Sequence, residues 1–292
     1  MRTAVAFAPG HISGFFQPVT DSNELDRIGS RGAGVCISHG VTANVQATKS
    51  KQLRIRVKVN GKPGGFPVTL KAVKTVLGQE SFEVNLDVTM DLPVGQGFGM
   101  SAASALSSSL AMAAILDKPR TLAIQAAHHA EITHHTGLGD VCTAAIGGFE
   151  IRKKPGIPPY GDILKIPEKQ SIYLGIFPGI ISTKSILTNN IRLNHISAIG
   201  SYCTDQVIQS PSVESIMNYS YYFTVKSGLA PRKILQVLEQ INKQCQASMC
   251  MLGHSIFALG NDEEIKALIS KQATLKETMV DTIGARILET SF

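Results

Sequence analysis

Alternating apolar and polar positions divide the first half of the chain into strands. Leu53–Val59 alternates apolar and polar or basic residues over its whole length and runs into the turn Asn60-Gly61, which is typical of a strand with one solvated face. Apolar or alternating runs predict further strands over residues 3–8, 32–46, 82–90 and 146–151. Helical periodicity and strong helix formers predict helices over residues 67–77, 101–116 and 121–136.

The densest run of proline and glycine, residues 153–161, predicts a connection between two halves of the chain. Beyond it, the pattern predicts strands over 172–177, 249–258 and 282–288, and helices over 183–209, 212–227, 231–243 and 262–271. Because strands and helices follow one another in a mixed order, we expect an α+β fold and not a doubly wound sheet. We therefore divide the chain into two domains, residues 1–160 and 161–292.

Length and composition favour a globular protein. A chain of 292 residues with 43% hydrophobic content can fill one large or two ordinary cores. No uninterrupted apolar stretch reaches the roughly 18 residues of a membrane span, and the N-terminus does not resemble a signal peptide. We therefore expect a cytoplasmic location and no membrane partner.

The cysteines and histidines give little sign of a soft-metal site. The five cysteines are scattered and odd in number, which argues against a disulfide framework, and no CxxC pair is present. The four neighbouring histidines, His128, His129, His134 and His135, do not form the HExxH zinc pattern. We expect any metal ion to be held by oxygen atoms.

The positive charge of the chain leaves a nucleic-acid partner open. The formal net charge is +6 and the isoelectric point is near 9.0, but the basic residues are spread out, with short concentrations only at 49–51 and 152–154. The stripe of Arg54, Arg56 and Lys58 fits the solvated face of a strand. A modest positive field attracts ATP and an acidic substrate equally well, so we expect no nucleic-acid partner.

The most informative motif is the glycine-dense segment LPVGQGFGMSAA at residues 92–103. Glycines at alternate positions let successive backbone N–H groups converge on an anion, and the following helix points its positive end at the same place. A plain strand-to-helix turn is the alternative. The Walker lysine and the Rossmann glycine spacing are both absent. We predict that a nucleotide phosphate is bound by Pro93, Gly95, Gln96, Gly97, Phe98, Gly99, Met100, Ser101 and Ala102.

This segment resembles the second motif of the GHMP kinase superfamily, PxxxGLGSSAA, with Phe98 in place of leucine and Met100 in place of the first serine. Residues 6–16 are similar to the first motif, in which superfamily members often carry lysine or arginine where this chain has His11. Residues 248–258 occupy the place of the third motif but keep only Gly253. The resemblance implies the GHMP kinase fold, with an N-terminal ribosomal-S5-like α/β domain and a C-terminal ferredoxin-like α+β domain.

The resemblance also implies a phosphoryl-transfer centre. Glu131 and Asp140 match the helical glutamate and the aspartate after a glycine-containing turn that take part there. Glu131 and the Ser101 hydroxyl suit Mg²⁺, Asp140 would orient the acceptor hydroxyl and take its proton, and His11 would donate to a phosphate or substrate oxygen. A helix cap for Asp140, a solvated helix position for Glu131 and a passive loop position for His11 are the alternatives.

Five blocks resemble an archaeal branch of the superfamily, the pantoate kinases: APGHxxGFF, GSRGAGV, LPVGQGFGMSAA, GLGDV and MLGxxxFALG, starting at residues 8, 29, 92, 137 and 251. The resemblance implies ATP-dependent phosphorylation of the 4-hydroxyl of (R)-pantoate in archaeal coenzyme A synthesis. Arg31 and Lys184 are candidate partners of the substrate carboxylate, with solvated surface cations as the alternative. A kinase of another small alcohol (homoserine, shikimate or mevalonate type) and a non-catalytic nucleotide-binding protein stay open, as does a homodimer.

Overall fold

The computed structural model of the chain describes residues 1–64, 66–179 and 190–291. Within these residues, helices pack against two sheets, which confirms the expected α+β class. The larger, 8-stranded sheet has the order β12-β1-β2-β5-β3-β4, with β6 paired to β2 and β7 paired to β6. Its strands are β1 (Arg2–Val19), β2 (Gly29–Lys49), β3 (Arg54–Val59), β4 (Lys62–Pro63), β5 (Phe82–Met90), β6 (Phe149–Lys154), β7 (Asp162–Ile166) and β12 (Arg286–Ser291).

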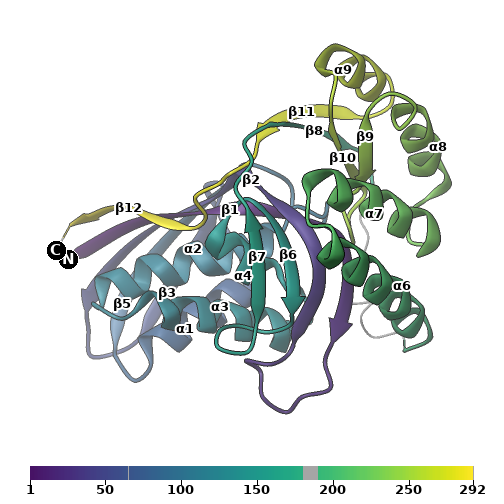
Figure 1. Cartoon of the computed structure of the whole chain (residues 1–292). Helices are drawn as coiled ribbons and strands as arrows, with labels where there is room; N and C mark the ends of the chain where they lie inside the picture. The colour runs from purple at the N-terminus through teal and green to yellow at the C-terminus, as the bar shows by residue number, and fades with distance from the viewer. Residues whose placement is uncertain (65, 180–189, 292) are drawn as a thin grey trace.

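Four helices pack together against this sheet (Figure 1): α1 (Pro67–Leu77), α2 (Met100–Ile115), α3 (Arg120–His134) and α4 (Asp140–Ile146). Helix α2 is at their centre, in contact with α1, α3 and the strands β1 and β2. All its residues except Ser101 and Ala114 are buried, because its alanine and serine side chains are small enough for neighbours to approach from every side. The helix that follows the glycine-rich segment is therefore fixed in the core.

The smaller sheet has four antiparallel strands in the order β11-β8-β10-β9. Its strands are β8 (Ser171–Ile176), β9 (Gln246–Met249), β10 (Ser255–Leu259) and β11 (Thr274–Met279), and the helices around it are α6 (Asn190–Gln209), α7 (Val213–Lys226), α8 (Arg232–Ile241) and α9 (Asp262–Ser270). Helices α6 and α7 also contact β1. These contacts join the second half of the chain to the larger sheet (Figure 1). No helix within the described ranges has the length and apolar character needed to cross a bilayer.

Strand β1 is longer than the sequence pattern predicts. The predicted strand ends at Ala8, before Pro9-Gly10, but the observed strand continues to Val19. Register shifts after Pro9 and after Ser13 absorb the irregular positions while pairing with β2 continues. His11 is therefore held in a paired strand and not in a loop.

The other predicted elements agree in part with the structure. The helix over 67–77 and the strand over 82–90 have their predicted bounds. The single strand predicted over 249–258 is wrong, because Leu252 has a φ of 62° and a turn separates β9 from β10. The pattern also missed α4, β7, β11 and the two-residue strand β4. Of the helix predicted over 183–209, residues 183–189 lie outside the described part.

The division of the chain at residue 160 stays a prediction. Two strands from the predicted second domain, β7 and β12, pair within the larger sheet. In β12, Ser291 lies opposite Thr3 of β1, and Figure 1 shows the two chain ends side by side.

Glycines allow α6 and α7 to approach β1 closely. A Cβ atom at Gly200 of α6 would lie 2.0 Å from the carbonyl oxygen of Phe16, and one at Gly14 of β1 would lie 1.9 Å from Oγ of Ser220 in α7. Real Cβ atoms essentially never approach so closely. Both helix–strand contacts therefore need a residue without a side chain.

We expect Gly200→Ala to destabilise the protein. At an open helix position this change stabilises by about 0.5–1 kcal/mol, whereas here the new methyl group pushes α6 away from Phe16, and overpacking of this kind costs about 1–3 kcal/mol. Urea unfolding measures the change, with Ser201→Ala in the next position of α6 as the control. An increase in the free energy of unfolding for Gly200→Ala would contradict the close contact.

Candidate active site

The segment between β5 and α2 has the backbone conformation that its glycines predict. Gly95, Gly97 and Gly99 have φ values of 80°, 81° and 64°, in the left-handed region that favours glycine. Gly99 is also the N-cap of α2, and no side chain caps this helix end. The N–H groups of the first turn are thus available to an anion, and the positive end of the helix dipole favours one there.

The backbone of this loop is held from two sides. The N–H of His11 donates to the carbonyl oxygen of Phe98 at 3.0 Å, and the Ser255 hydroxyl of β10 donates to the carbonyl oxygen of Gln96. A Cβ atom at Gly253, in the turn between β9 and β10, would lie 2.0 Å from the carbonyl carbon of Gln96. Strand β1 and the β9–β10 turn therefore fix the loop between them.

A cavity of about 310 Å³ lies beside the loop and the start of α2. Seven of the nine residues predicted to bind the nucleotide line it: Gly95, Gly97, Phe98, Gly99, Met100, Ser101 and Ala102. Pro93 and Gln96 do not line it, and the Gln96 side chain instead donates to the carbonyl oxygen of Gly179 at 2.7 Å. The cavity is also lined by Ser13, Ser30, Glu131, Asp140 and Leu252.

Two predicted metal ligands touch at the start of α2. The Ser101 hydroxyl donates to Oε1 of Glu131 at 2.6 Å, and the Thr136 hydroxyl donates to the same oxygen at 2.9 Å. Burial raises the pKa of Glu131 to about 7. Hard oxygen donors beside an anion-binding loop fit Mg²⁺, which needs only one or two protein ligands besides phosphate oxygens.

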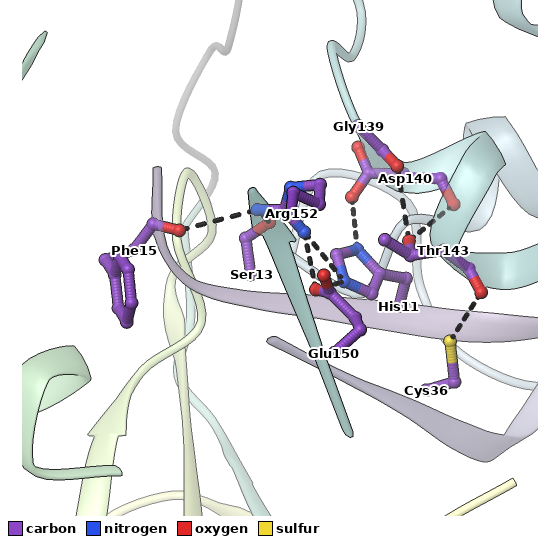
Figure 2. A network of polar contacts seen from close by, with 9 residues as sticks. All are labelled: His11, Ser13, Phe15, Cys36, Gly139, Asp140, Thr143, Glu150 and Arg152. Atoms are coloured by element: carbon purple, nitrogen blue, oxygen red, sulfur yellow. Dashed lines mark hydrogen bonds and ion pairs between the residues drawn. The ribbon is translucent and has the colours of Figure 1, made fainter. Parts of the chain in front are cut away.

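A second cluster joins β1, α4 and β6 behind the cavity (Figure 2). His11 Nδ1 lies 2.6 Å from Oδ1 of Asp140, and His11 Nε2 lies 2.9 Å from Oε1 of Glu150. The same Oε1 atom accepts a hydrogen bond from Nη1 of Arg152 at 2.5 Å. His11, Glu150 and Arg152 are buried, and the side chain of Asp140 keeps 24% exposure toward the cavity.

The charges of this cluster shift the pKa values of its members. Burial alone would lower the pKa of His11, but the hydrogen bonds and charges of Asp140 and Glu150 outweigh burial and raise it. Burial would raise the pKa of Asp140, but the hydrogen bond and charge of His11 and the charge of Arg152 lower it. Asp140 is therefore ionised at neutral pH, next to the cavity.

Sequence reasoning missed Glu150 and Arg152. Arg152 was assigned to a short basic run, but it is among the largest fully buried side chains of the described residues. The available signal was a pair of opposite charges two positions apart, which alternate with the apolar residues Phe149 and Ile151 and therefore lie on one face of the strand. A buried face with charges of both signs indicates a specific polar network.

Of the two residues predicted to bind the substrate carboxylate, the structure describes Arg31. Arg31 does not line the cavity, and its guanidinium donates to the Lys153 carbonyl, the Gln17 side chain and Asp205, at 3.0, 2.9 and 2.5 Å. Lys184 lies outside the described residues. A substrate role for either residue stays a prediction.

The neighbouring histidines of α3 lie within hydrogen-bond distance of oxygen atoms of the protein. His128 Nε2 lies 3.0 Å from the Ile28 carbonyl oxygen, and His129 Nε2 lies 2.6 Å from Oδ1 of Asp26. His134 Nδ1 lies 2.8 Å from the Ala130 carbonyl oxygen. Among the residues that the structure describes, no group of three or more His, Cys, Asp or Glu side chains is placed to hold a metal ion.

Comparisons with known proteins agree with this geometry. Residues 68–148 match the family model of the GHMP kinases N terminal domain. The pantoate kinase of Methanocaldococcus jannaschii is 34% identical over 90% of this chain and 95% of its own length, and that of Methanospirillum hungatei is 36% identical over 90% of both chains. A solved structure described as a phosphotransferase related to the CoA biosynthesis pathway superposes with a TM-score of 0.89 at 28% identity, over 99% of both chains. The chain therefore belongs to the pantoate kinase family of the GHMP kinases.

Proposed function

We propose that this protein transfers the terminal phosphoryl group of ATP to the 4-hydroxyl of (R)-pantoate, an early step of coenzyme A synthesis. The observation that carries the proposal is the shared cavity: the glycine-rich loop, the uncapped start of α2 and the ionised Asp140 all line it. An anion-binding loop and an acceptor-orienting carboxylate at one cavity are what phosphoryl transfer needs. The membership of the pantoate kinase family supports the choice of acceptor.

Each part of the site has a separate role in this proposal. The N–H groups of the loop and of the first turn of α2 hold the phosphate oxygens and the charge that develops on them. Asp140 accepts a hydrogen bond from the pantoate hydroxyl and aims it at the terminal phosphate. Since the pKa of Asp140 is lowered, orientation contributes more than basicity, which suits a loose transition state. Mg²⁺, held by Ser101 and Glu131, supplies charge neutralisation when bound.

The carboxylate of pantoate needs a cation near the acceptor hydroxyl. Arg31 and Lys184 were predicted for this role, but Arg31 is already bound to protein groups. Nε of Arg152 has no hydrogen-bond partner among the described residues. However, Arg152 is buried, does not line the cavity and is paired with Glu150. Arg31 and Lys184 therefore stay the two predicted candidates.

The cytoplasmic location, the possible homodimer and the division into domains at residue 160 remain proposals from the sequence.

Measured turnover tests the choice of acceptor. With Mg-ATP, we expect (R)-pantoate to be phosphorylated with a kcat/KM at least about a hundredfold above homoserine, shikimate and mevalonate, because a buried site that pairs polar groups with one substrate rejects those that leave them unpaired. Coupled ADP release and identification of the product by NMR provide the readout. Turnover of another alcohol in place of pantoate would overturn the substrate and keep the kinase, and no turnover of any alcohol would favour a non-catalytic nucleotide-binding protein.

Asp140→Asn tests the acceptor-side carboxylate. We expect kcat to fall by about 10²–10⁴-fold, the range for a positioned acid–base group, while the Kd for ATP changes less than about threefold, because Asp140 is assigned to the acceptor hydroxyl and not to the nucleotide. Steady-state kinetics and nucleotide binding by calorimetry measure the two quantities. Asp87→Asn on the exposed face of β5 is the matched control. Equal losses in kcat and ATP affinity would assign Asp140 a structural role.

Glu131→Gln tests the proposed magnesium site. The amide keeps the size of the side chain but loses the charge, so we expect the Mg²⁺ concentration for half-maximal activity to rise by about tenfold or more. A Mg²⁺ titration at saturating ATP and pantoate gives this value, with Glu263→Gln on exposed α9 as the control. An unchanged Mg²⁺ requirement would remove Glu131 from the metal site.

A further inference from the structure

Two carboxylates contact one imidazole, with one at each ring nitrogen. Asp140 lies 2.6 Å from Nδ1 of His11, and Glu150 lies 2.9 Å from Nε2 (Figure 2). An ionised carboxylate can only accept hydrogen bonds, and a neutral imidazole carries a hydrogen on one nitrogen only. Asp140 is ionised, and the guanidinium of Arg152 on Oε1 favours the ionised form of Glu150 as well. With both carboxylates ionised, the two contacts together require the doubly protonated, positively charged ring.

The balance of buried charge leads to the same protonation state. Arg152 Nη1 and His11 Nε2 approach the same oxygen, Oε1 of Glu150, and are themselves 3.5 Å apart. With His11 charged, two cations face two carboxylates. With His11 neutral, the cluster would bury an uncompensated negative charge, which is costly in a protein interior.

We propose that Glu150 is a positioning residue for phosphoryl transfer, which keeps His11 doubly protonated so that Asp140 is held ionised and fixed through Oδ1. Glu150 does not line the cavity, and its side chain is fully buried. It acts on Asp140 through His11, which touches both carboxylates. The other oxygen of Asp140 is left for the acceptor: a Cβ atom at Gly137 in the cavity wall would lie 2.8 Å from Oδ2.

Among the groups that face His11, Glu150 is the one that determines whether the ring keeps its second proton. Asp140 comes from α4, Glu150 and Arg152 come from β6, and Cys36 lies opposite His11 in β2. Burial raises the pKa of the Cys36 thiol well above its ordinary value, so it stays neutral, and Arg152 is permanently charged. Loss of the Glu150 charge therefore lowers the pKa of His11, and the charged ring is lost as the pH rises.

Nuclear magnetic resonance of ¹⁵N-histidine-labelled protein tests the protonation state without turnover. We expect both ring nitrogens of His11 to be protonated at pH 7–8 in the wild-type protein, with His11→Gln identifying the signals. In Glu150→Gln, one nitrogen should lose its proton over this range. A wild-type ring with a single protonated nitrogen at pH 7 would overturn the proposal, whether or not any variant folds.

The pH dependence of kcat tests the positioning role, which rests on the proposed function. In Glu150→Gln, we expect kcat for pantoate to match the wild type most closely near pH 6 and to fall about tenfold or more below it at pH 8, because loss of the Glu150 charge lowers the pKa of His11. KM for ATP should change less than about twofold. Glu150→Asp, which keeps the charge, should restore part of the loss.

The matched control is Glu83→Gln. This change removes the carboxylate of the Arg56–Glu83 ion pair, which is more exposed than the Glu150–Arg152 pair, and should leave the pH profile of kcat unchanged. A Glu150→Gln profile that is lowered equally at all pH values, or not at all, would refute the positioning role. If pantoate is not a substrate, the resonance experiment still decides the state of His11, so failure of the proposed function and failure of this inference give different results.

Discussion

The site depends on the close approach of three backbones that side chains would keep apart. The glycine-rich loop lies between β1 and the β9–β10 turn, where Gly10, Gly97 and Gly253 leave little or no room for a Cβ atom. A Cβ atom at Gly10 would lie 3.0 Å from the Phe98 carbonyl oxygen, and one at Gly97 would lie 2.8 Å from that of Cys250. One neighbour, β1, is a paired strand, and the other is the tight β9–β10 hairpin. The loop is therefore ordered when the protein folds, so anion binding does not carry the entropic cost of ordering it.

This constraint explains why the site needs both parts of the chain. The loop, α2 and Asp140 come from the first 146 residues, but the hairpin that holds Gln96 in place comes from residues 246–259. The third motif of the superfamily is reduced to one glycine here, and that glycine is the one that touches the loop backbone. This one glycine is therefore enough for the hairpin to pack closely against the loop.

Local sequence predicted those features whose cause is local. The left-handed glycines of the loop, the helix beginning at Met100 and the touching pair Ser101 and Glu131 follow from residue type, spacing and the family motif. The pairing of His11 with Glu150 does not, because it joins residues 139 positions apart through the register of β1, β2 and β6. The hairpin at Leu252 was missed because the sequence has no typical turn residue at this position. The left-handed conformation of Leu252 is imposed by tertiary structure. Arg31 has the right chemistry for a carboxylate, but the fold gives it Asp205 as a partner instead.

The pairing of β12 with β1 determines when the larger sheet can be completed during synthesis of the chain. Strand β1 carries His11 and precedes the other described elements, but its outer edge is not paired with β12 until Arg286–Ser291 has been synthesised. Contacts of such large sequence separation form late, and an unpaired strand edge is a template for association with other chains. The nascent chain therefore carries an open sheet edge while all the described elements between β1 and β12 are made, and the strand that supports the catalytic cluster is completed only after them.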